Sequence, residues 1–312
     1  MSTTPSINLI QNTTFGVEIE MTGITRESAA RVAATVIGGT VSHPGGNYDK
    51  WRVTDSRGRE WDFVYDSSII ASRTDMKCEL NTPPITYAED MEVLQELIRA
   101  LRSAGAVSGT QYGCGIHVHV SGKGHTFKTV RNFINLMYSN DELIRKSLGV
   151  TYERQRWCKP ITADLVEAAK TATSMDALCD AWYRTYAPYG DRNAHYNDSR
   201  YHILNLHRYF STLGRPSNTL EIRAFNACLH AGEVRAYVLL VLSMNASALT
   251  QKSIRALKNP IMEAGNEKFA MRTWLNRMGW TGEMFKNPHK LFVKRLNGDA
   301  AWRFGKNGDQ FH

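Results

Sequence analysis

Short segments in which polar and apolar residues alternate are the clearest pattern in this chain. Alternation with a period of two, combined with β-branched residues, is typical of strands that have one apolar and one polar face. The segments that show it, or that read as the arms of a hairpin, are Phe15–Thr22, Trp51–Thr54, Glu60–Tyr65, Lys77–Asn81, Ile116–Ser121, Tyr201–Tyr209 and Thr219–Phe225. We expect these segments to form a sheet.

Helical periodicity separates these strands. Apolar residues recur every three or four positions in the segments 25–37, 86–103, 126–148, 162–187 and 230–257. Thr86 to Glu89 has the form of a capping box, and Ser139-Asn140 predicts that the helix of residues 126–148 is broken into two pieces. The chain beyond residue 260 is also expected to be helical.

The order of the elements defines the expected fold class. It runs strand, helix, hairpin, strand, helix, strand, helices, strand pair and helix, which is typical of an α+β fold. We expect a largely antiparallel sheet with helices on its outer face and a polar inner face. Residues 1–260 are expected to form the main domain, and residues 261–312 a basic helical extension packed on it.

Bulk composition is that of an ordinary globular protein. A chain of 312 residues is long enough to bury a sizeable core, and its apolar content of 42% and charged content of 22% are ordinary for a globular protein. The N-terminus lacks the basic and apolar regions of a signal peptide, and the apolar run Val234–Leu249 is too short and too polar to span a bilayer. The five cysteines are scattered without a CxxC pair, so neither a disulfide framework nor a cysteine zinc site is indicated. We therefore expect a cytoplasmic protein with no membrane partner.

The net charge of +8 is concentrated at the C-terminal end of the chain. Residues 251–312 contain twelve Lys and Arg against five Asp and Glu. Such a region could contact nucleic acid or another polyanion. The simpler interpretation, which we favour, is the solvated basic face of a helical subdomain.

Glu18 and Glu20 are the first candidates for a functional site. They lie two residues apart on a predicted strand, so they share one face at a spacing of about 6–7 Å. Two like charges are tolerated there by water or by cations, and this strand alone favours water. The same polar–apolar–polar pattern recurs on the other strands, and together their polar faces carry Glu18, Glu20, Glu79, His117, His119, Glu221 and Arg223. That set indicates a site for metals and phosphate.

The residue types in this set suit phosphate chemistry with hard cations. Mg²⁺ takes a few carboxylates, water and substrate phosphates, and Mn²⁺ also accepts an imidazole. Arg223 could contact a phosphoryl group with two hydrogen bonds. No Walker A lysine loop is present, so metals and side chains would hold the phosphates. Taken singly, each histidine could be structural, and Glu221 with Arg223 a surface ion pair worth under about 1 kcal/mol.

Several motifs resemble those of known ligases. The segment GCGIHVHVS at residues 113–121 resembles the GSGMHxHxS strand of glutamine synthetases, and FGVEIE and LEIR resemble the paired-glutamate and ExR strands of that superfamily. With Asp66-Ser67-Ser68 and CELNTPP at residues 78–84, the spacing over about residues 12–260 looks most like the amidoligase family. This family is related to glutamine synthetase and glutamate–cysteine ligase.

The resemblance implies a fold, a reaction and a set of residue roles. The fold is the curved antiparallel catalytic sheet of glutamine synthetase and glutamate–cysteine ligase, in residues 1–260. ATP would phosphorylate a carboxylate, and an amine would then displace phosphate, leaving an amide, ADP and phosphate. The implied cofactors are ATP and Mg²⁺ or Mn²⁺. The implied metal ligands are Glu18, Glu20, Glu79, His117 and Glu221, and Glu79 is also expected to be catalytic. His119 and Ser121 would lie towards the nucleotide phosphates. Arg223 would contact both the cofactor and the transferring phosphoryl group.

The chain also departs from glutamine synthetases. Fourteen residues precede Phe15, so we expect no β-grasp domain and a site completed within one chain. No ammonia-site carboxylate can be assigned, so the amine is expected to be larger than ammonia, such as an amino acid, a peptide or a polyamine. The loop Tyr186–Asp198 is a lid candidate. Arg200, beside it, is expected to act on the acceptor side.

Two other functions remain open from the sequence. A metal-dependent hydrolase would use the carboxylates and the HxH pair with a metal-bound water. A nucleic-acid-binding protein would use the basic C-terminal region, and its binding would be sensitive to salt. We favour the ligase because it also accounts for Arg223 beside four carboxylates.

Overall fold

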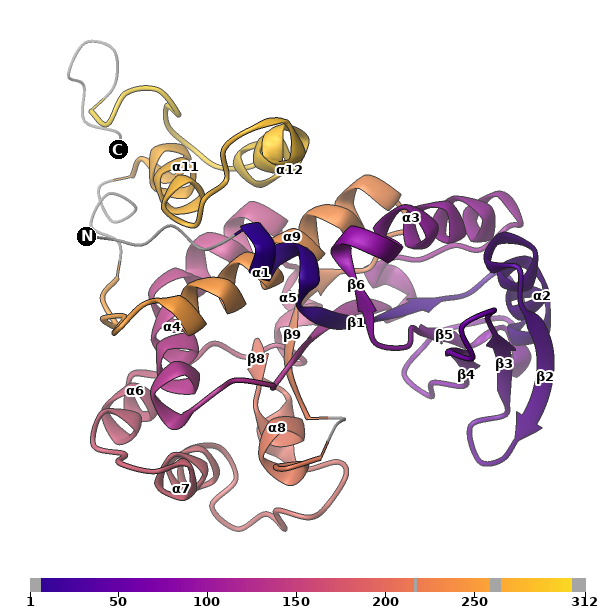
Figure 1. The fold of residues 1–312 in the computed structure, drawn as a ribbon, viewed down its shortest axis with the longest axis horizontal. Helices are drawn as coiled ribbons and strands as arrows, with labels where there is room; N and C mark the ends of the chain where they lie inside the picture. Colours follow the sequence, from indigo (N-terminus) through magenta and orange to yellow (C-terminus); the bar gives the residue numbers. More distant parts are fainter. Residues whose placement is uncertain (1–6, 216–217, 259–264, 305–312) are drawn as a thin grey trace.

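One antiparallel sheet organises the fold. The computed structural model describes residues 7–215, 218–258 and 265–304. Within them, nine strands form a sheet in the order β2-β3-β4-β5-β1-β7-β9-β8, with β6 paired to β1, and every ladder is antiparallel (Figure 1). The strands are β1 (Thr14–Met21), β2 (Thr40–Gly45), β3 (Lys50–Thr54), β4 (Glu60–Val64), β5 (Cys78–Asn81), β6 (Ile85–Thr86), β7 (Gly115–Ser121), β8 (Leu204–Asn205) and β9 (Thr219–Asn226).

Helices fill most of the connections between the strands. They are α1 (Ile7–Asn12), α2 (Arg26–Ile37), α3 (Tyr87–Ser103), α4 (Phe127–Leu148), α5 (Tyr152–Gln155), α6 (Ala163–Lys170), α7 (Met175–Tyr186), α8 (His207–Ser211), α9 (Ala231–Thr250), α11 (Glu267–Arg277) and α12 (Glu283–Val293). The α+β class and the antiparallel sheet predicted from the sequence are therefore confirmed.

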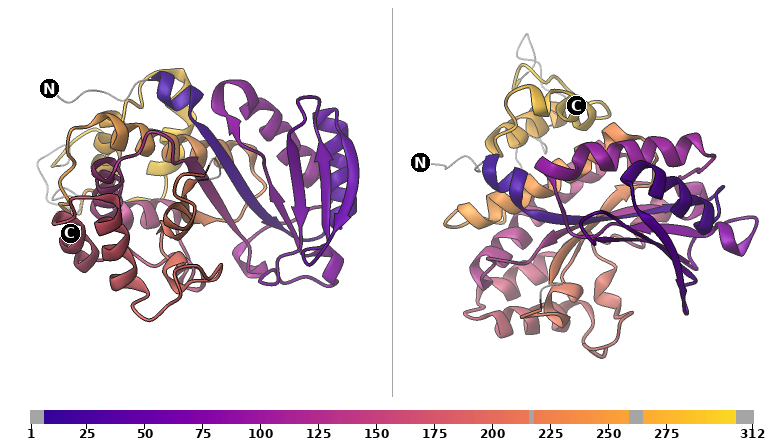
Figure 2. Two further views of the ribbon diagram at one scale, coloured as in Figure 1. Left: turned by 60° about the horizontal axis from the view of Figure 1, so that its bottom comes forward. Right: turned by 45° about the vertical axis from the view of Figure 1, so that its right-hand side comes forward.

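The central strand β1 shows how the sheet separates core from site. Phe15, Val17 and Ile19 are buried in the hydrophobic core. Glu18 and Glu20 alternate with them and so lie on the opposite face. Figures 1 and 2 show α3 and α9 on one side of the sheet and α7 and α8 on the other. The polar face is thus bordered by α7, α8 and the loop between them.

Helix α9 is the centre of the core. Almost all of its side chains from Val234 to Ala248 are buried, and it contacts α1, α3, α4 and α12. A helix that is apolar all round requires neighbours on every side. The C-terminal part of the chain supplies some of them: α12 contacts α9, and Trp280, between α11 and α12, donates from Nε1 to Ser243 Oγ at 2.8 Å. The expected boundary at residues 260/261 lies outside the described residues, so the two-domain division stays a prediction.

The predicted break at Ser139-Asn140 is wrong, because α4 is continuous. Both side chains bond within the helix: Ser139 Oγ donates to the Asn135 carbonyl and Asn140 Nδ2 to the Leu136 carbonyl, each at 2.8 Å. Polar side chains that reach the carbonyl four residues back are compatible with a helix interior.

The predicted capping box at Thr86 is also wrong. The Thr86 side chain makes no capping bond, and its backbone N–H donates to Asp90 Oδ2 at 2.9 Å. Asp90 is held in place by Arg59 Nη1 at 2.9 Å, while Glu89 pairs with Arg57. The carboxylate that accepts the Thr86 N–H is therefore that of Asp90 instead of the predicted Glu89, because the ion pairs with Arg59 and Arg57 fix the two side chains.

The predicted strand Tyr201–Tyr209 is much shorter than expected. Only Leu204–Asn205 pairs with β9, and α8 begins at His207. Asn205 Oδ1 accepts a hydrogen bond from the His207 N–H at 2.9 Å, and such a side-chain contact turns the chain out of the sheet.

Two expectations drawn from composition can be compared with the described residues. All five cysteines are free. No helix in the described part of the chain is long and apolar enough to cross a bilayer.

Candidate metal and anion site

The register of the sheet brings the predicted site residues together on its polar face. Residues that face each other in an antiparallel ladder have Cβ atoms about 4.5–5.5 Å apart, so their side chains interact directly. The facing pairs are Glu18–His117, Glu20–Glu79 and His119–Glu221. The predicted constellation of carboxylates and imidazoles is therefore a contiguous surface across β5, β1, β7 and β9.

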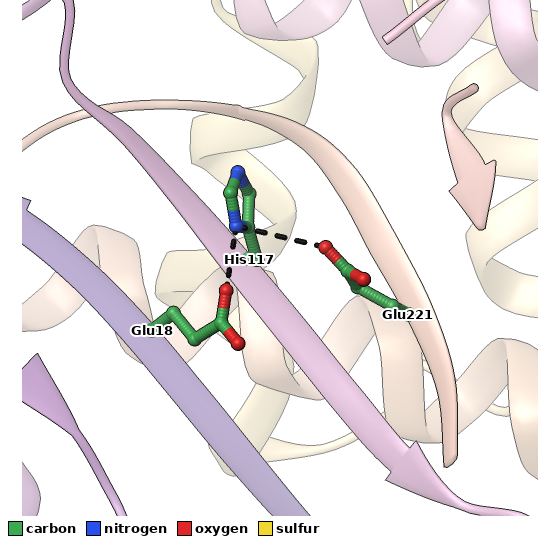
Figure 3. Close-up of side chains that lie close together, drawn as sticks. All are labelled: Glu18, His117 and Glu221. Carbon is green, nitrogen blue, oxygen red and sulfur yellow. Dashed lines mark hydrogen bonds and ion pairs between the residues drawn. The ribbon is translucent and has the colours of Figure 1, made fainter. Parts of the chain in front are cut away.

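Three of these side chains form what we call the histidine cluster: Glu18, His117 and Glu221. Each comes from a different strand, and all three point toward one another (Figure 3). His117 Nδ1 lies 2.8 Å from Glu18 Oε2 and 3.6 Å from Glu221 Oε1. His117 and Glu221 are buried, whereas the Glu18 side chain is 30% exposed and opens the cluster to solvent.

A second group, the carboxylate cluster, consists of Glu20, Asp66 and Glu79. The Gly115 N–H donates to Glu20 Oε2 at 2.6 Å, and Asn81 Nδ2 donates to Glu79 Oε1 at 2.9 Å. Asp66, in the loop after β4, was not among the predicted ligands. Its only signal in the sequence was its place directly after a strand in the Asp66-Ser67-Ser68 motif.

The geometry of both clusters fits a hard divalent cation. Within each, one ligand atom per residue lies within 4.8 Å of the others. An ion with ligands at about 2.1 Å places those ligand atoms about 3–4 Å apart, so small side-chain shifts suffice. Carboxylates alone suit Mg²⁺, and carboxylates with an imidazole also suit Mn²⁺.

The pKa values of the two histidines are shifted in opposite directions. Burial and the nearby Arg223 lower the pKa of His117 to about 4, so its imidazole is neutral at pH 7. Burial also opposes the charge on His119, but Glu18 and Glu221 outweigh it and raise the pKa of His119. Neutral imidazole is the form that binds metals, and protonated imidazole binds anions. The two histidines of the HxH pair are therefore suited to different ligands.

The carboxylates of the two clusters differ as well. Burial works against the charge on Glu221, but Arg223 and the histidines lower its pKa to about 2. Burial raises the pKa of Glu79 well above its usual range, and Glu18 and Glu20 raise it further. Burial likewise raises the pKa of Glu20 to about 7. Full ionisation of the carboxylate cluster is therefore unfavourable in the metal-free protein, and a bound cation would compensate the charge.

Arg223 and Asn205 hold Glu221 in place. Arg223 Nη1 donates to Glu221 Oε1 at 2.5 Å, and Asn205 Nδ2 donates to Glu221 Oε2 at 2.6 Å. Both carboxylate oxygens therefore have a protein donor. Asn205 was not predicted as a site residue, although its polar side chain on a predicted strand gave a signal.

Replacing Asn205 with alanine should weaken Mn²⁺ binding about 10- to 100-fold, the usual cost of losing a group that orients a metal ligand. Calorimetric titration of the purified protein with Mn²⁺ measures this. Asn132 is a matched control, since it is also buried and donates to the Ala248 and Gln251 carbonyls. Asn132→Ala should lower stability without changing the Mn²⁺ affinity. Equal affinities in wild type and Asn205→Ala would show that Asn205 does not orient Glu221.

His119 and Ser121 extend the site along β7. His119 Nε2 lies 2.9 Å from Glu18 Oε1, and its Nδ1 lies 3.3 Å from Thr219 Oγ1. Ser121, half-buried at the end of the strand, accepts a hydrogen bond from the Lys123 N–H at 3.2 Å. The polar face therefore continues past the histidine cluster toward this end of β7.

Arg200 lies outside both clusters. Its guanidinium donates to the His195 carbonyl at 3.3 Å and lies 5.2 Å from the ring centre of Tyr196. The loop that contains His195 and Tyr196 reaches the β2–β3 hairpin. There the hydroxyl oxygens of Tyr196 and Tyr48 are hydrogen-bonded at 3.0 Å. Arg200 thus lies just after the loop Tyr186–Asp198 that is expected to be a lid, and contacts two residues of it.

Together these features define a class of site, in which two acidic clusters suited to divalent cations lie on the polar face of an antiparallel sheet. The model of the family described as "Putative amidoligase enzyme" matches residues 11–245. This range is well over half of the chain and includes every residue of both clusters. The chain belongs to this amidoligase family.

Comparisons with individual proteins add less. The chain is similar to the crystal structure of a bifunctional glutathione synthetase from Pasteurella multocida, with 14% sequence identity and a TM-score of 0.42. The similarity covers 93% of this chain and 47% of that chain, so this chain spans about half of its length. A comparison with curated proteins finds no match.

Proposed function

We propose that this protein is an ATP-dependent amidoligase that joins a carboxylate to an amine through an acyl phosphate. ATP would transfer its γ-phosphoryl group to the carboxylate, the amine would then displace phosphate, and the products would be an amide, ADP and phosphate. The observation that carries the proposal is the pair of three-ligand clusters side by side on one sheet, with Arg223 next to them. Membership of the amidoligase family supports it.

The histidine cluster (Glu18, His117 and Glu221) and the carboxylate cluster (Glu20, Asp66 and Glu79) would each hold one Mg²⁺ or Mn²⁺ ion. Bound there, such ions would neutralise phosphate oxygens and the substrate carboxylate. Phosphoryl transfer needs positioning and charge neutralisation more than covalent help from the protein. Glu79 therefore acts as a ligand in this proposal, and its contribution to catalysis is made through the metal.

The cationic residues would bind the nucleotide and the group in transfer. His119, whose pKa is raised by Glu18 and Glu221, and Ser121 further along β7 would donate to the phosphates of ATP. Arg223, fixed by Glu221 at 2.5 Å, would present its remaining donors to the transferring phosphoryl group. Arg200 and its loop would cover the acceptor side, where the amine enters.

The test is ADP release by the purified full-length chain with ATP and Mg²⁺, in the presence of pooled amino acids, short peptides or polyamines. We expect at least one pool to stimulate release and to form a product with the mass of an amide. Metal-dependent turnover of a substrate without ATP would instead indicate a hydrolase. Salt-sensitive binding of nucleic acid, without stimulated ADP release by any pool, would favour a role for the basic C-terminal region.

A further inference from the structure

Arg154, on the short helix α5, is a buried cation that makes no direct ion pair in the described part of the chain, although the Glu20 carboxylate favours its charge from a distance. Only 5% of the residue is exposed, and among the described residues its Nε has no hydrogen-bond partner. Within the same residues its one guanidinium hydrogen bond runs from Nη2 to the Arg223 carbonyl and is long, at 3.3 Å. Among the residues that the structure describes, no carboxylate oxygen lies within 4.0 Å of this guanidinium.

The guanidinium lies on the floor of the site. A Cβ atom added to Gly115 would be 2.2 Å from the Cζ, Nη1 and Nη2 atoms of Arg154, so the group rests directly on the Gly115 backbone. Gly115 is two residues before His117 and shares its face of β7. The same Gly115 donates its N–H to Glu20. Arg154 therefore lies at the end of the site next to the carboxylate cluster.

This arrangement leaves the guanidinium only partly compensated, and a bound anion would complete its pairing. Burying an unpaired ion costs several kcal/mol, and an arginine cannot avoid the cost by losing its proton. The Glu20 carboxylate offsets part of this cost without direct contact, and the guanidinium of Arg223 adds to the cost. Arg223 itself is already paired with Glu221, whereas Arg154 has donors to spare. Arg154 is thus the guanidinium that is free to receive an external oxyanion.

The position along β7 indicates which oxyanion this is. His119 and Ser121, the proposed contacts of the ATP phosphates, lie four and six residues beyond Gly115. At about 3.3 Å per residue, these positions are about 13 and 20 Å away along the strand. The histidine cluster lies between the two ends. Phosphoryl transfer is in line between adjacent oxygens, so ATP would extend from His119 with its γ-phosphate at the histidine cluster, and the acceptor carboxylate would approach from the Arg154 end.

We propose that Arg154 binds the carboxylate group of the acyl substrate, and that Gly115 is a glycine because the guanidinium occupies the place of its side chain. The inference rests on the proposed ligase function for the identity of the ligand. The bond formed is a charge-assisted hydrogen bond pair from the guanidinium to the two carboxylate oxygens. Arg154 keeps this contact as one oxygen becomes the bridge to the transferred phosphoryl group.

The first test needs no knowledge of the substrate. Arg154→Gln is compared with Arg156→Gln, an exposed arginine two residues further on, by thermal unfolding in EDTA. If the charge of Arg154 serves to bind a ligand, removing that charge should leave the melting temperature of the ligand-free and metal-free protein unchanged or higher. A structural arginine would behave in the opposite way. An Arg154→Gln variant that is clearly less stable than Arg156→Gln would overturn the proposal.

The second test uses acetate as a minimal carboxylate and inorganic phosphate as the competing anion, both with Mg²⁺. We expect acetate to stabilise the wild-type protein. Arg154→Gln should weaken acetate binding about 10- to 100-fold, the worth of hydrogen bonds to a charged group, and Arg156→Gln should not. Gly115→Ala, which keeps the charge but displaces the guanidinium, should also weaken it. Stabilisation by phosphate alone, or none by acetate in the wild type, would contradict the assignment.

A third measurement separates this inference from the proposed function. Once a stimulating pool is found, Arg154→Lys should raise KM for the carboxylate substrate about tenfold and leave KM for ATP unchanged, because lysine keeps the charge but loses the paired donors. An increase in KM for ATP instead would place Arg154 at the nucleotide. If no pool stimulates ADP release but Arg154-dependent acetate binding is present, the ligase function fails and the carboxylate site remains.

Discussion

Replacing Glu18 with glutamine should lower metal-dependent ADP release by at least about 100-fold, more than the loss expected for a group that only orients a ligand. Glu18 is at the centre of the histidine cluster, since its two carboxylate oxygens lie 2.8 Å from His117 Nδ1 and 2.9 Å from His119 Nε2. Glutamine has nearly the same shape but lacks the charge. The variant would lose a metal ligand and, with it, the carboxylate that raises the pKa of His119 most strongly.

Steady-state ADP release at saturating Mg²⁺ or Mn²⁺ measures this effect. Glu27→Gln is the control, because the Glu27 side chain on α2 is 46% exposed and, among the described residues, pairs only with Arg31 four residues away. Such a pair contributes less than about 1 kcal/mol, and activity should be unchanged. If Glu18→Gln retains activity within a few-fold of wild type, the histidine cluster does not hold a catalytic metal.

Replacing Glu79 with glutamine should make the metal-free protein more stable at pH 8, because the amide has the same shape but carries no charge to bury. Burial raises the pKa of Glu79 well above its usual range, and the pKa of Glu20 to about 7. A raised carboxyl pKa favours folding while the group is protonated. That stability is lost as the pH rises from the unfolded pKa, near 4.5, through the folded one.

Thermal unfolding in EDTA at pH 5.5 and pH 8 measures this second effect. The wild type should lose more stability between the two pH values than Glu79→Gln does, and the difference isolates the cluster from other titrating groups. Mg²⁺ at pH 8 should stabilise the wild type and have much less effect on the variant. Equal pH dependence in both proteins, or equal stabilisation by Mg²⁺, would show that charge in the carboxylate cluster does not destabilise the folded protein.

The site was largely predictable wherever it rests on strands. The alternation in FGVEIEM fixes which residues face the core, because a one-residue slip would bury Glu18 and expose Val17. The same reasoning holds for β7 and β9. The alternating pattern of three strands therefore predicts that Glu18, His117 and Glu221, the residues of the histidine cluster, lie on the same face of the sheet.

The residues that were missed do not follow such a pattern. Asp66 comes from a loop, and Arg154 from a helix of four residues, so neither has a periodicity that predicts its direction. Asn205 was placed on a strand, but the short β8 and the turn into α8 depend on its own side-chain hydrogen bonds. The same limit applies to the division of charge between the two histidines, which is set by Arg223, Glu18 and Glu221 in three dimensions.

The central claim is that the polar face of this sheet holds divalent cations for phosphoryl transfer. Anomalous diffraction from crystals of the full-length protein soaked with Mn²⁺ and a non-hydrolysable ATP analogue tests it most directly. We predict one Mn²⁺ peak among Glu18, His117 and Glu221 and a second among Glu20, Asp66 and Glu79, with the phosphates of the analogue beside His119. Saturating Mn²⁺ that leaves both clusters without a peak would contradict the account.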